Sequence, residues 1–163
     1  MDDVGRAFFC APVRRQVFVD IPDEDADHRD IVGELNFSMY GTRDAAQIWG
    51  EECAVTMKAI GFEQGKASPC VFLYKTRNIR TYIHGDDFVS VGKDEDLKWL
   101  KTEIEKKYEL KTQVLGPDKP DLQEVKVLNR ILRWTSEGVK YEADPRHAEL
   151  IIKDLGLQKA NGV

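Results

Sequence analysis

Three acidic residues in two short segments are the side chains of this sequence most suited to chemistry. Gly85-Asp86-Asp87 lies between two β-prone runs, residues 80–84 and 88–92. A glycine followed by two acids favours a tight turn, so a hairpin would present both carboxylates at or near its tip. Adjacent carboxylates repel each other, and a divalent cation can neutralise that repulsion. For this motif taken alone, an ordinary polar turn stays open as the alternative.

The third acid, Asp3, begins a β-prone run over residues 3–8, which could lie beside the hairpin in the same sheet. Three carboxylates on two neighbouring strands can hold two Mg²⁺ ions about 3.5–4 Å apart. Such a pair of ions can activate a 3′-hydroxyl and stabilise the leaving pyrophosphate in nucleotidyl transfer. The acids therefore indicate a candidate two-metal site.

Alternating strand and helix patterns must position these acids. The strand-like runs span residues 4–9, 16–19, 70–75, 80–84, 88–92, 109–115 and 125–134. With three helical segments, the order is ββ-α-βββ-α-ββ-α. That order is typical of an α+β fold with hairpins rather than of successive βα units.

The three helical segments have apolar residues at helical spacing. The first spans residues 42–60, with Thr42 as its expected N-cap. The second is expected to be capped by Asp94. The third opens at Asp144-Pro145 and ends at Gly156.

Composition limits the class of protein. The 163 residues, 42% hydrophobic and 33% charged, suffice for one domain with a single core. No apolar run approaches the ~18 residues of a membrane span, so no membrane partner is expected. Three widely spaced cysteines favour a reduced, intracellular chain, with Cys53 and Cys70 expected to be buried. A net charge of −5 disfavours a general nucleic-acid coat but leaves room for a local basic groove.

Two segments are expected to connect the ordered blocks. The stretch at about residues 20–34 is rich in Asp and Glu, which predicts a solvated surface loop. Glycine and proline at residues 116–120 mark a second connection. His28 and His147 have no Cys or His neighbour at metal-ligand spacing, so both are expected to be solvated.

Four motifs occur in a characteristic order. Residues 3–8 read D-V-G-R-A-F, and residues 38–49 read S-M-Y-G-T-R-D-A-A-Q-I-W. Gly-Phe at 61–62 leads to Ser-Pro-Cys at 68–70, and residues 84–87 read H-G-D-D. This ordered set resembles the reverse transcriptase of copia-type retrotransposons, whose motifs are D-V-x-x-A-F, S-L-Y-G-L-K-Q-A-P-R-x-W, G-F…D-P-C and Y-V-D-D. The resemblance covers nearly the whole chain.

The resemblance implies a fold and an activity. The fold would be a polymerase palm-like antiparallel sheet packed on two helices, with a partial fingers insertion and a short C-terminal thumb-like helix. Residues 1–115 would form the palm, with the acidic partial-fingers loop at about 20–34, and residues 116–163 a primer-grip-like hairpin and the start of the thumb. The activity would be RNA-directed DNA polymerisation with two Mg²⁺ ions, for which Mn²⁺ could substitute.

Catalytic roles follow from the same resemblance. Asp3 and Asp86 would be the main metal ligands, supported by Asp87 and by the backbone carbonyl of Val4. The residues expected to bind the nucleotide are Arg6, Ala7, Phe8, Tyr40 and Gly41. The residues expected to contact template or primer are Arg43, His84, Gly85 and Asn129. Phe8 would meet the sugar of the incoming nucleotide and exclude a ribose 2′-hydroxyl; packing in the core is the alternative for this ring.

The expected partners are an RNA template, a DNA primer, dNTPs and the rest of a polyprotein with fingers, ribonuclease H and integrase. The expected location is intracellular, in a cytoplasmic particle or the nucleus.

Several positions depart from the family motifs. His84 stands where the family has tyrosine, and Asn129 replaces a glycine in the primer-gripping turn. Asp44, Ala46 and Gln47 replace the glutamine, proline and arginine of the long motif. A catalytically inactive or domesticated remnant is therefore one alternative, and an unrelated Mg²⁺-dependent phosphotransfer or hydrolase domain is another.

Overall fold

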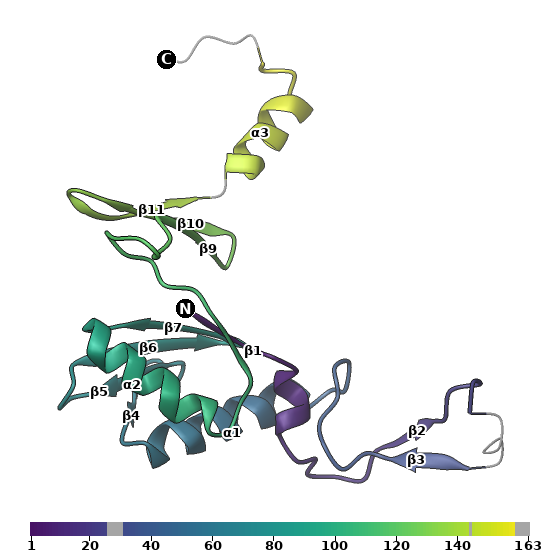
Figure 1. Cartoon of the computed structure of the whole chain (residues 1–163). Helices are drawn as coiled ribbons and strands as arrows, with labels where there is room; N and C mark the ends of the chain where they lie inside the picture. Colours follow the sequence, from purple (N-terminus) through teal and green to yellow (C-terminus); the bar gives the residue numbers. More distant parts are fainter. Residues whose placement is uncertain (26–30, 144, 159–163) are drawn as a thin grey trace. The chain divides into compact units, whose positions relative to one another are not determined.

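The computed structural model describes residues 1–25, 31–143 and 145–158 and has an α+β fold (Figure 1). The chain divides into two units, Met1–Thr112 and Gln113–Val163. The predicted α+β class is thus confirmed. Within the described residues, no helix is long and apolar enough to span a membrane.

A six-stranded sheet forms the centre of the first unit. In chain order its strands are β1 (Asp2–Val4), β4 (Glu63–Gln64), β5 (Val71–Tyr74), β6 (Ile79–His84), β7 (Asp87–Val91) and β8 (Leu110–Thr112). They lie side by side in the order β4-β5-β6-β7-β1-β8, and every neighbouring pair is antiparallel. The N-terminal strand β1 is therefore inserted between β7 and β8.

Two helices, α1 (Ala45–Ala59) and α2 (Asp94–Glu105), cover one face of this sheet (Figure 1). Along β6 the buried side chains Ile79, Thr81 and Ile83 alternate with exposed ones. This period of two places one set against the helices and the other on the opposite face. The sheet therefore has an apolar, helix-covered face and a more polar face.

The ends of α1 follow local backbone chemistry. Asp44 is the N-cap residue, whereas the hydroxyl of Thr42 donates to the carbonyl of Met39 at 2.8 Å. The prediction of Thr42 as N-cap is therefore wrong by two positions. Gly61 ends the helix with φ of 102°, and a Cβ at this position would lie 2.7 Å from the Tyr74 ring. Glycine is required there for both reasons.

The start of α2 lies one residue from its predicted position. Lys93 is the N-cap, so Asp94 is the first helical residue rather than the cap. Asp94, Glu95 and Asp96 all fall in the first turn, where carboxylates interact favourably with the helix dipole.

Two predictions for the N-terminal region are wrong. The strand expected over residues 4–9 ends at Val4 and is followed by a 3-10 helix, η1 (Ala7–Cys10). The acidic stretch at about 20–34 is not only a loop, because its two ends belong to β2 (Phe18–Asp20) and β3 (Val32–Glu34), which pair antiparallel. His28 lies outside the described residues.

The second unit contains three antiparallel strands and a helix: β9 (Glu124–Val127), β10 (Arg130–Thr135), β11 (Gly138–Ala143) and α3 (Pro145–Asp154). The single strand expected over residues 125–134 is wrong, because Leu128 and Asn129 turn the chain with φ of 47° and 59°. Asparagine tolerates this left-handed region, so the turn forms with Asn129 in place of the family's glycine. The predicted start of α3 at Asp144 lies outside the described residues.

The cysteines occupy different environments. Cys53 is buried, with 1% of its surface exposed, because it lies on the sheet-facing side of α1. Cys70 is exposed, so the prediction that it is buried is wrong. Its position immediately before β5 places it outside the alternating core pattern.

Candidate active site

A tight turn between β6 and β7 carries the paired acids. His84 and Asp87 are directly opposite each other, so Gly85 and Asp86 are the two turn residues. Gly85 has φ of 62°, and Asp86 has no positive φ. A type II′ hairpin turn has this pattern, with glycine at its first central position. Asp86 therefore lies at the tip, and Asp87 begins β7.

The third acid lies on the neighbouring strand. Asp3 of β1 is the direct antiparallel partner of Asp87 of β7. The backbone N–H of Val4 donates to the carbonyl of Asp86 at 2.9 Å, which ties β1 to the turn. The prediction that the run beginning at Asp3 lies beside the hairpin is confirmed, because β1 pairs with β7.

A row of four charged or ionisable residues crosses the sheet. Asp87 is paired with His84 on one side and with Asp3 on the other, and Asp3 is paired with Lys111 of β8. Directly paired residues share a face of the sheet. Because Phe88, the next residue after Asp87, is buried in the core, the row lies on the face opposite α1 and α2.

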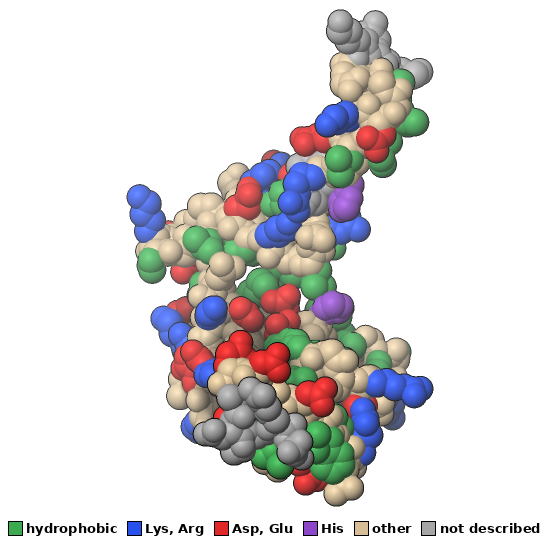
Figure 2. Space-filling model, turned by 90° about the vertical axis from the view of Figure 1, so that its right-hand side faces the viewer, with side chains coloured by type: hydrophobic (Ala, Val, Ile, Leu, Met, Phe, Trp, Pro, Cys, Tyr) green, Lys and Arg blue, Asp and Glu red, His purple; other side chains and the backbone are tan. Residues whose placement is uncertain are grey.

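The acids influence one another electrostatically. Partial burial raises the pKa of the Asp87 carboxyl, and the negative charges of Asp86 and Asp3 raise it further, while His84 opposes this effect. Figure 2 shows several acidic side chains, in red, close together on the face of the molecule that it presents. At the candidate site itself, the charges of Asp3 and Asp86 lie near enough to Asp87 to affect its pKa, which favours a bound cation.

The donor set fits a hard divalent cation, although the side chains do not converge. Carboxylate and carbonyl oxygens are the ligands that Mg²⁺ prefers. Among the described residues, no three His, Cys, Asp or Glu side chains are grouped so that they could hold a metal ion. The acids therefore have the charge and the oxygen ligands that Mg²⁺ prefers, but they are not grouped around one point. Asp86 lies in the turn, whereas Asp3 and Asp87 lie in strands.

The residues predicted to bind the nucleotide lie in different environments. Phe8 and Tyr40 are brought together, with ring centroids 4.4 Å apart. Ala7 is fully buried, backbone included, so no atom of this predicted contact residue is exposed to a ligand. Arg6 has φ of 53°, and its guanidinium donates to Glu109 at 3.1 Å. Gly41 has φ of 90°, and a Cβ added to it would meet no atom within 4 Å, so the space beside it is open.

The residues predicted to contact template or primer lie in both units. His84 is exposed and stacks on Tyr82, with ring centroids 6.5 Å apart and planes at 25°. Arg43 is exposed just before α1. Asn129 belongs to the second unit, where it forms the β9–β10 turn.

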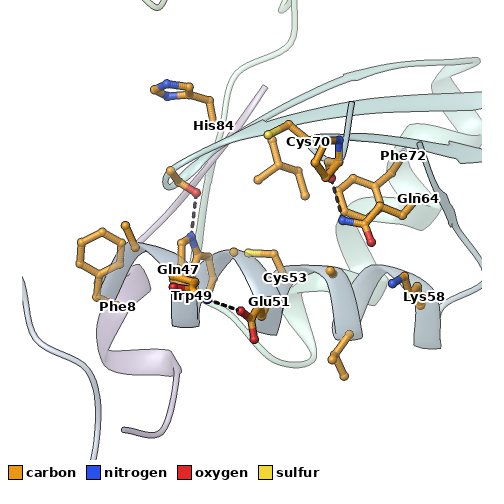
Figure 3. A pocket seen from close by; sticks show the side chains of 17 residues that line it. Phe8, Gln47, Trp49, Glu51, Cys53, Lys58, Gln64, Cys70, Phe72 and His84 are labelled. Carbon is orange, nitrogen blue, oxygen red and sulfur yellow. Dashed lines mark hydrogen bonds between the residues drawn. The ribbon is translucent and has the colours of Figure 1, made fainter. Parts of the chain in front are cut away.

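A cavity of about 560 Å³ adjoins the turn, between α1 and the strands β5 and β6 (Figure 3). Its lining includes Phe8 from the predicted nucleotide contacts, and His84 and Gly85 from the predicted template and primer contacts. Most of the wall is apolar, with Cys53 and Phe72 among the contributors. The fold thus gathers three predicted contact residues around one hollow.

Two residues at the site were not singled out from the sequence. Lys111 reaches the row only through the pairing of β1 with β8, for which the sequence contains no local signal. From the sequence, Trp49 is recognised only as the last residue of the motif at 38–49, yet its indole N–H donates to the carbonyl of Gly85 at 2.7 Å. A buried aromatic residue with a hydrogen-bond donor was the available signal for Trp49.

Comparison with known proteins identifies a family that this chain matches. Residues 1–133 match the family model described as reverse transcriptase (RNA-dependent DNA polymerase). A retrovirus-related Pol polyprotein from transposon TNT 1-94 of Nicotiana tabacum is 29% identical over 167 residues. That alignment covers 99% of this chain but 12% of the polyprotein, so the chain spans a small part of its relative's length. No solved structure matches.

Proposed function

Because this chain belongs to the reverse transcriptase (RNA-dependent DNA polymerase) family, we propose that its first unit is the catalytic palm of such a polymerase. It would add dNTPs to the 3′ end of a DNA primer under the direction of an RNA template. The observation that carries this proposal is the direct pairing of Asp3 with Asp87 beside the Asp86 turn. The alternative of an unrelated phosphotransferase or hydrolase does not agree with the family match.

The carboxylates of Asp3, Asp86 and Asp87 and the backbone carbonyl of Val4 would hold two Mg²⁺ ions, or Mn²⁺ in their place. When bound, the ions would supply Lewis-acid activation of the primer 3′-hydroxyl and charge stabilisation for the leaving pyrophosphate. The protein's part is to place the three acids on adjacent strands and the turn between them. Burial is the main cause of the raised pKa of Asp87, and the charges of Asp86 and Asp3 add to it, so this carboxyl stands where a cation would be favoured.

Phe8 and Tyr40 would form the surface against which the incoming nucleotide packs. Their rings are in contact with planes at 35°, and Tyr40 is 46% exposed, so an aromatic surface is available for a sugar or base. Phe8 offers no hydroxyl partner, so a ribose 2′-OH placed against it would lose hydrogen bonds. Arg6 would contact the triphosphate, and the open space at Gly41 would leave room for the base.

Each unit would contribute contacts to nucleic acid. Arg43, His84 and Gly85 are proposed contacts to template and primer within the palm. In the second unit, the β9–β10 turn at Asn129 would act as the primer grip, and α3 would begin the thumb. The acidic hairpin β2–β3 would belong to the fingers.

The rest of the enzyme would come from a longer polyprotein, because the relative is a Pol polyprotein and this chain aligns with 12% of it. Fingers, ribonuclease H and integrase are the proposed neighbours. Replication would then take place inside the cell, in a cytoplasmic particle or the nucleus.

Primer extension tests the proposal. The full chain is supplied with a homopolymer RNA template, a complementary DNA primer, dNTP and Mg²⁺ or Mn²⁺. We expect extension by the unaltered chain, loss of about 10²–10³-fold in Asp86→Asn, and no loss in Asp118→Asn, which makes the same chemical change at an exposed position of the second unit.

Extension that persists in Asp86→Asn would refute the assignment of the acids. A folded chain that binds Mg²⁺ but extends no primer would instead identify an inactive remnant.

A further inference from the structure

We propose that Trp49 is a positioning residue for the acid-bearing turn: its indole N–H holds the carbonyl of Gly85 and thereby fixes where Asp86 and Asp87 stand. This inference rests on the proposed function for the catalytic roles of these two acids. The hydrogen bond from Trp49 Nε1 to Gly85 O is 2.7 Å long (Figure 3).

Both residues of the turn are held through their carbonyl groups. Gly85 O accepts from Trp49 of α1, and Asp86 O accepts from the N–H of Val4 at 2.9 Å. One bond comes from a helix beneath the sheet, and the other comes from the neighbouring strand. A two-residue turn with glycine in a left-handed conformation has much backbone freedom of its own. The two bonds remove that freedom.

The indole is itself held in place by the core. Trp49 is 1% exposed, and the ring of Tyr108 packs edge-on against it with centroids 5.2 Å apart. The hydroxyl of Tyr108 is 2.8 Å from the hydroxyl of Thr56, which also accepts from Lys107 at 3.0 Å. The donor is therefore fixed independently of the turn that it binds. A preorganised donor of this kind is what a supporting residue needs.

The bond acts against a force present at this place. Asp3 is the cross-strand partner of Asp87, and like charges placed opposite each other disfavour the pairing of β1 with β7 beside the turn. The hydrogen bonds from Trp49 and Val4 hold the same turn in place. Among aromatic side chains, tryptophan combines a large apolar ring with an obligate N–H donor, which suits a buried position with one acceptor to satisfy.

The inference links two motifs that the sequence shows only separately. Trp49 ends the motif at residues 38–49, and Gly85 lies within the motif at residues 84–87. The residues of this hydrogen bond are 36 positions apart in the chain. With the Val4 bond, the turn is the meeting point of three of the four motifs.

Trp49→Phe tests the proposal because it keeps an aromatic ring and removes the donor. Trp99→Phe is the matched control: Trp99 packs on Tyr74 and under Arg77, and it does not bond to the turn. The first readout is hydrogen exchange of the Val4 backbone amide in a ¹⁵N-labelled full chain, which needs no activity. We expect this amide to exchange about fivefold to tenfold faster in Trp49→Phe, as for loss of one hydrogen bond, and at the unaltered rate in Trp99→Phe.

The second readout is primer extension. In Trp49→Phe we expect kcat to fall about ten- to a hundredfold and the Mg²⁺ concentration for half-maximal rate to rise, with a smaller change in the KM for dNTP. In Trp99→Phe both values should stay unchanged. A general loss of stability would instead speed exchange throughout the core and lower the fraction of active protein, without changing the Mg²⁺ requirement.

A third readout uses the unaltered chain in case Trp49→Phe does not fold. The indole N–H signal of Trp49 should be protected from exchange more strongly than those of Trp99 and Trp134. It should shift when Mg²⁺ is added, together with the amide of Asp86.

Fast exchange of the Trp49 indole, or an unchanged Val4 amide in a folded Trp49→Phe, would overturn the proposal. If the unaltered chain extends no primer, the proposed function fails, while the exchange data still decide whether Trp49 holds the turn.

Discussion

Asp3 and Asp87 are direct partners across β1 and β7, so two carboxylates stand side by side on the face of the sheet that the helices do not cover. Like charges placed opposite each other destabilise an antiparallel pair. The pKa of Asp87 is raised by burial and then by the charges of Asp86 and Asp3, which shows that the repulsion acts on this group. A fold that keeps such a pair gives up stability at the position where a cation would restore it.

The first prediction concerns the ionisation of Asp87. In Asp3→Asn the neighbouring negative charge is lost, so the charged form of Asp87 becomes easier to produce and its pKa should fall. The fall should be partial, because burial is the larger cause of the raised value. A ¹³C NMR titration of the Asp87 carboxyl in metal-free buffer measures the effect. Asp94→Asn on α2 is the control and should leave the midpoint unchanged; an equal or higher midpoint in Asp3→Asn would contradict the electrostatic account.

The second prediction concerns stability, pH and Mg²⁺. Because the pKa of Asp87 is raised in the folded chain, its contribution to stability is present below its unfolded pKa and is lost as the pH rises through the folded pKa. At neutral pH the acids therefore oppose folding, and bound Mg²⁺ should stabilise the chain by about 2.7 kcal/mol at a hundredfold excess over its dissociation constant.

Thermal unfolding with Mg²⁺, compared with NaCl of equal ionic strength, measures this effect. Asp86→Asn should lose most of the Mg²⁺ effect. Equal stabilisation of both proteins by Mg²⁺ would place the ion elsewhere.

Local backbone requirements were predictable from the sequence. The stop at Gly61, the turn at Gly85 and the left-handed Asn129 all depend on residues with unusual conformational freedom, and the structure has each of them. The early end of β1 was not predictable in the same way. There the amides of Val4 and Gly5 bond to Asp86 and Glu109, and Arg6 turns the chain with a left-handed φ that its residue type does not signal.

The candidate site likewise combines features that could be predicted from the sequence with features that could not. The proximity of Asp3 to the double aspartate could be predicted, because one β-prone run beside a hairpin is a simple arrangement. The contributions of Trp49 and Lys111 depend on a helix-to-turn contact and on a strand register. Both contacts are tertiary, so the nearby sequence does not show which groups Trp49 and Lys111 meet. The exposure of Cys70 was missed because a residue just before a strand does not follow the alternation within it.

The third prediction concerns thiol reactivity. Burial raises the pKa of the Cys53 thiol, so little thiolate forms there, whereas Cys70 is exposed. Alkylation under native conditions at mildly alkaline pH should modify Cys70 first and leave Cys53 unmodified until the chain unfolds. Mass spectrometry of peptides after timed quenching gives the order. Cys70→Ser should remove the fast phase; a fast phase on Cys53 would show that the α1 packing is open in solution.

The fourth prediction concerns the choice between ribose and deoxyribose. If Phe8 meets the sugar of the nucleotide, Phe8→Val should leave room for a 2′-hydroxyl and raise the efficiency of rNTP relative to dNTP incorporation by about tenfold or more. Phe9→Val is the matched control, since Phe9 is the adjacent residue, is 45% exposed and also contacts Tyr40, with centroids 5.8 Å apart. Its rNTP-to-dNTP ratio should not change. The ratio of kcat/KM values separates discrimination from stability, because loss of folded protein lowers both incorporations equally. A fall in both with an unchanged ratio would identify Phe8 as a core residue, in keeping with its packing against the buried cluster.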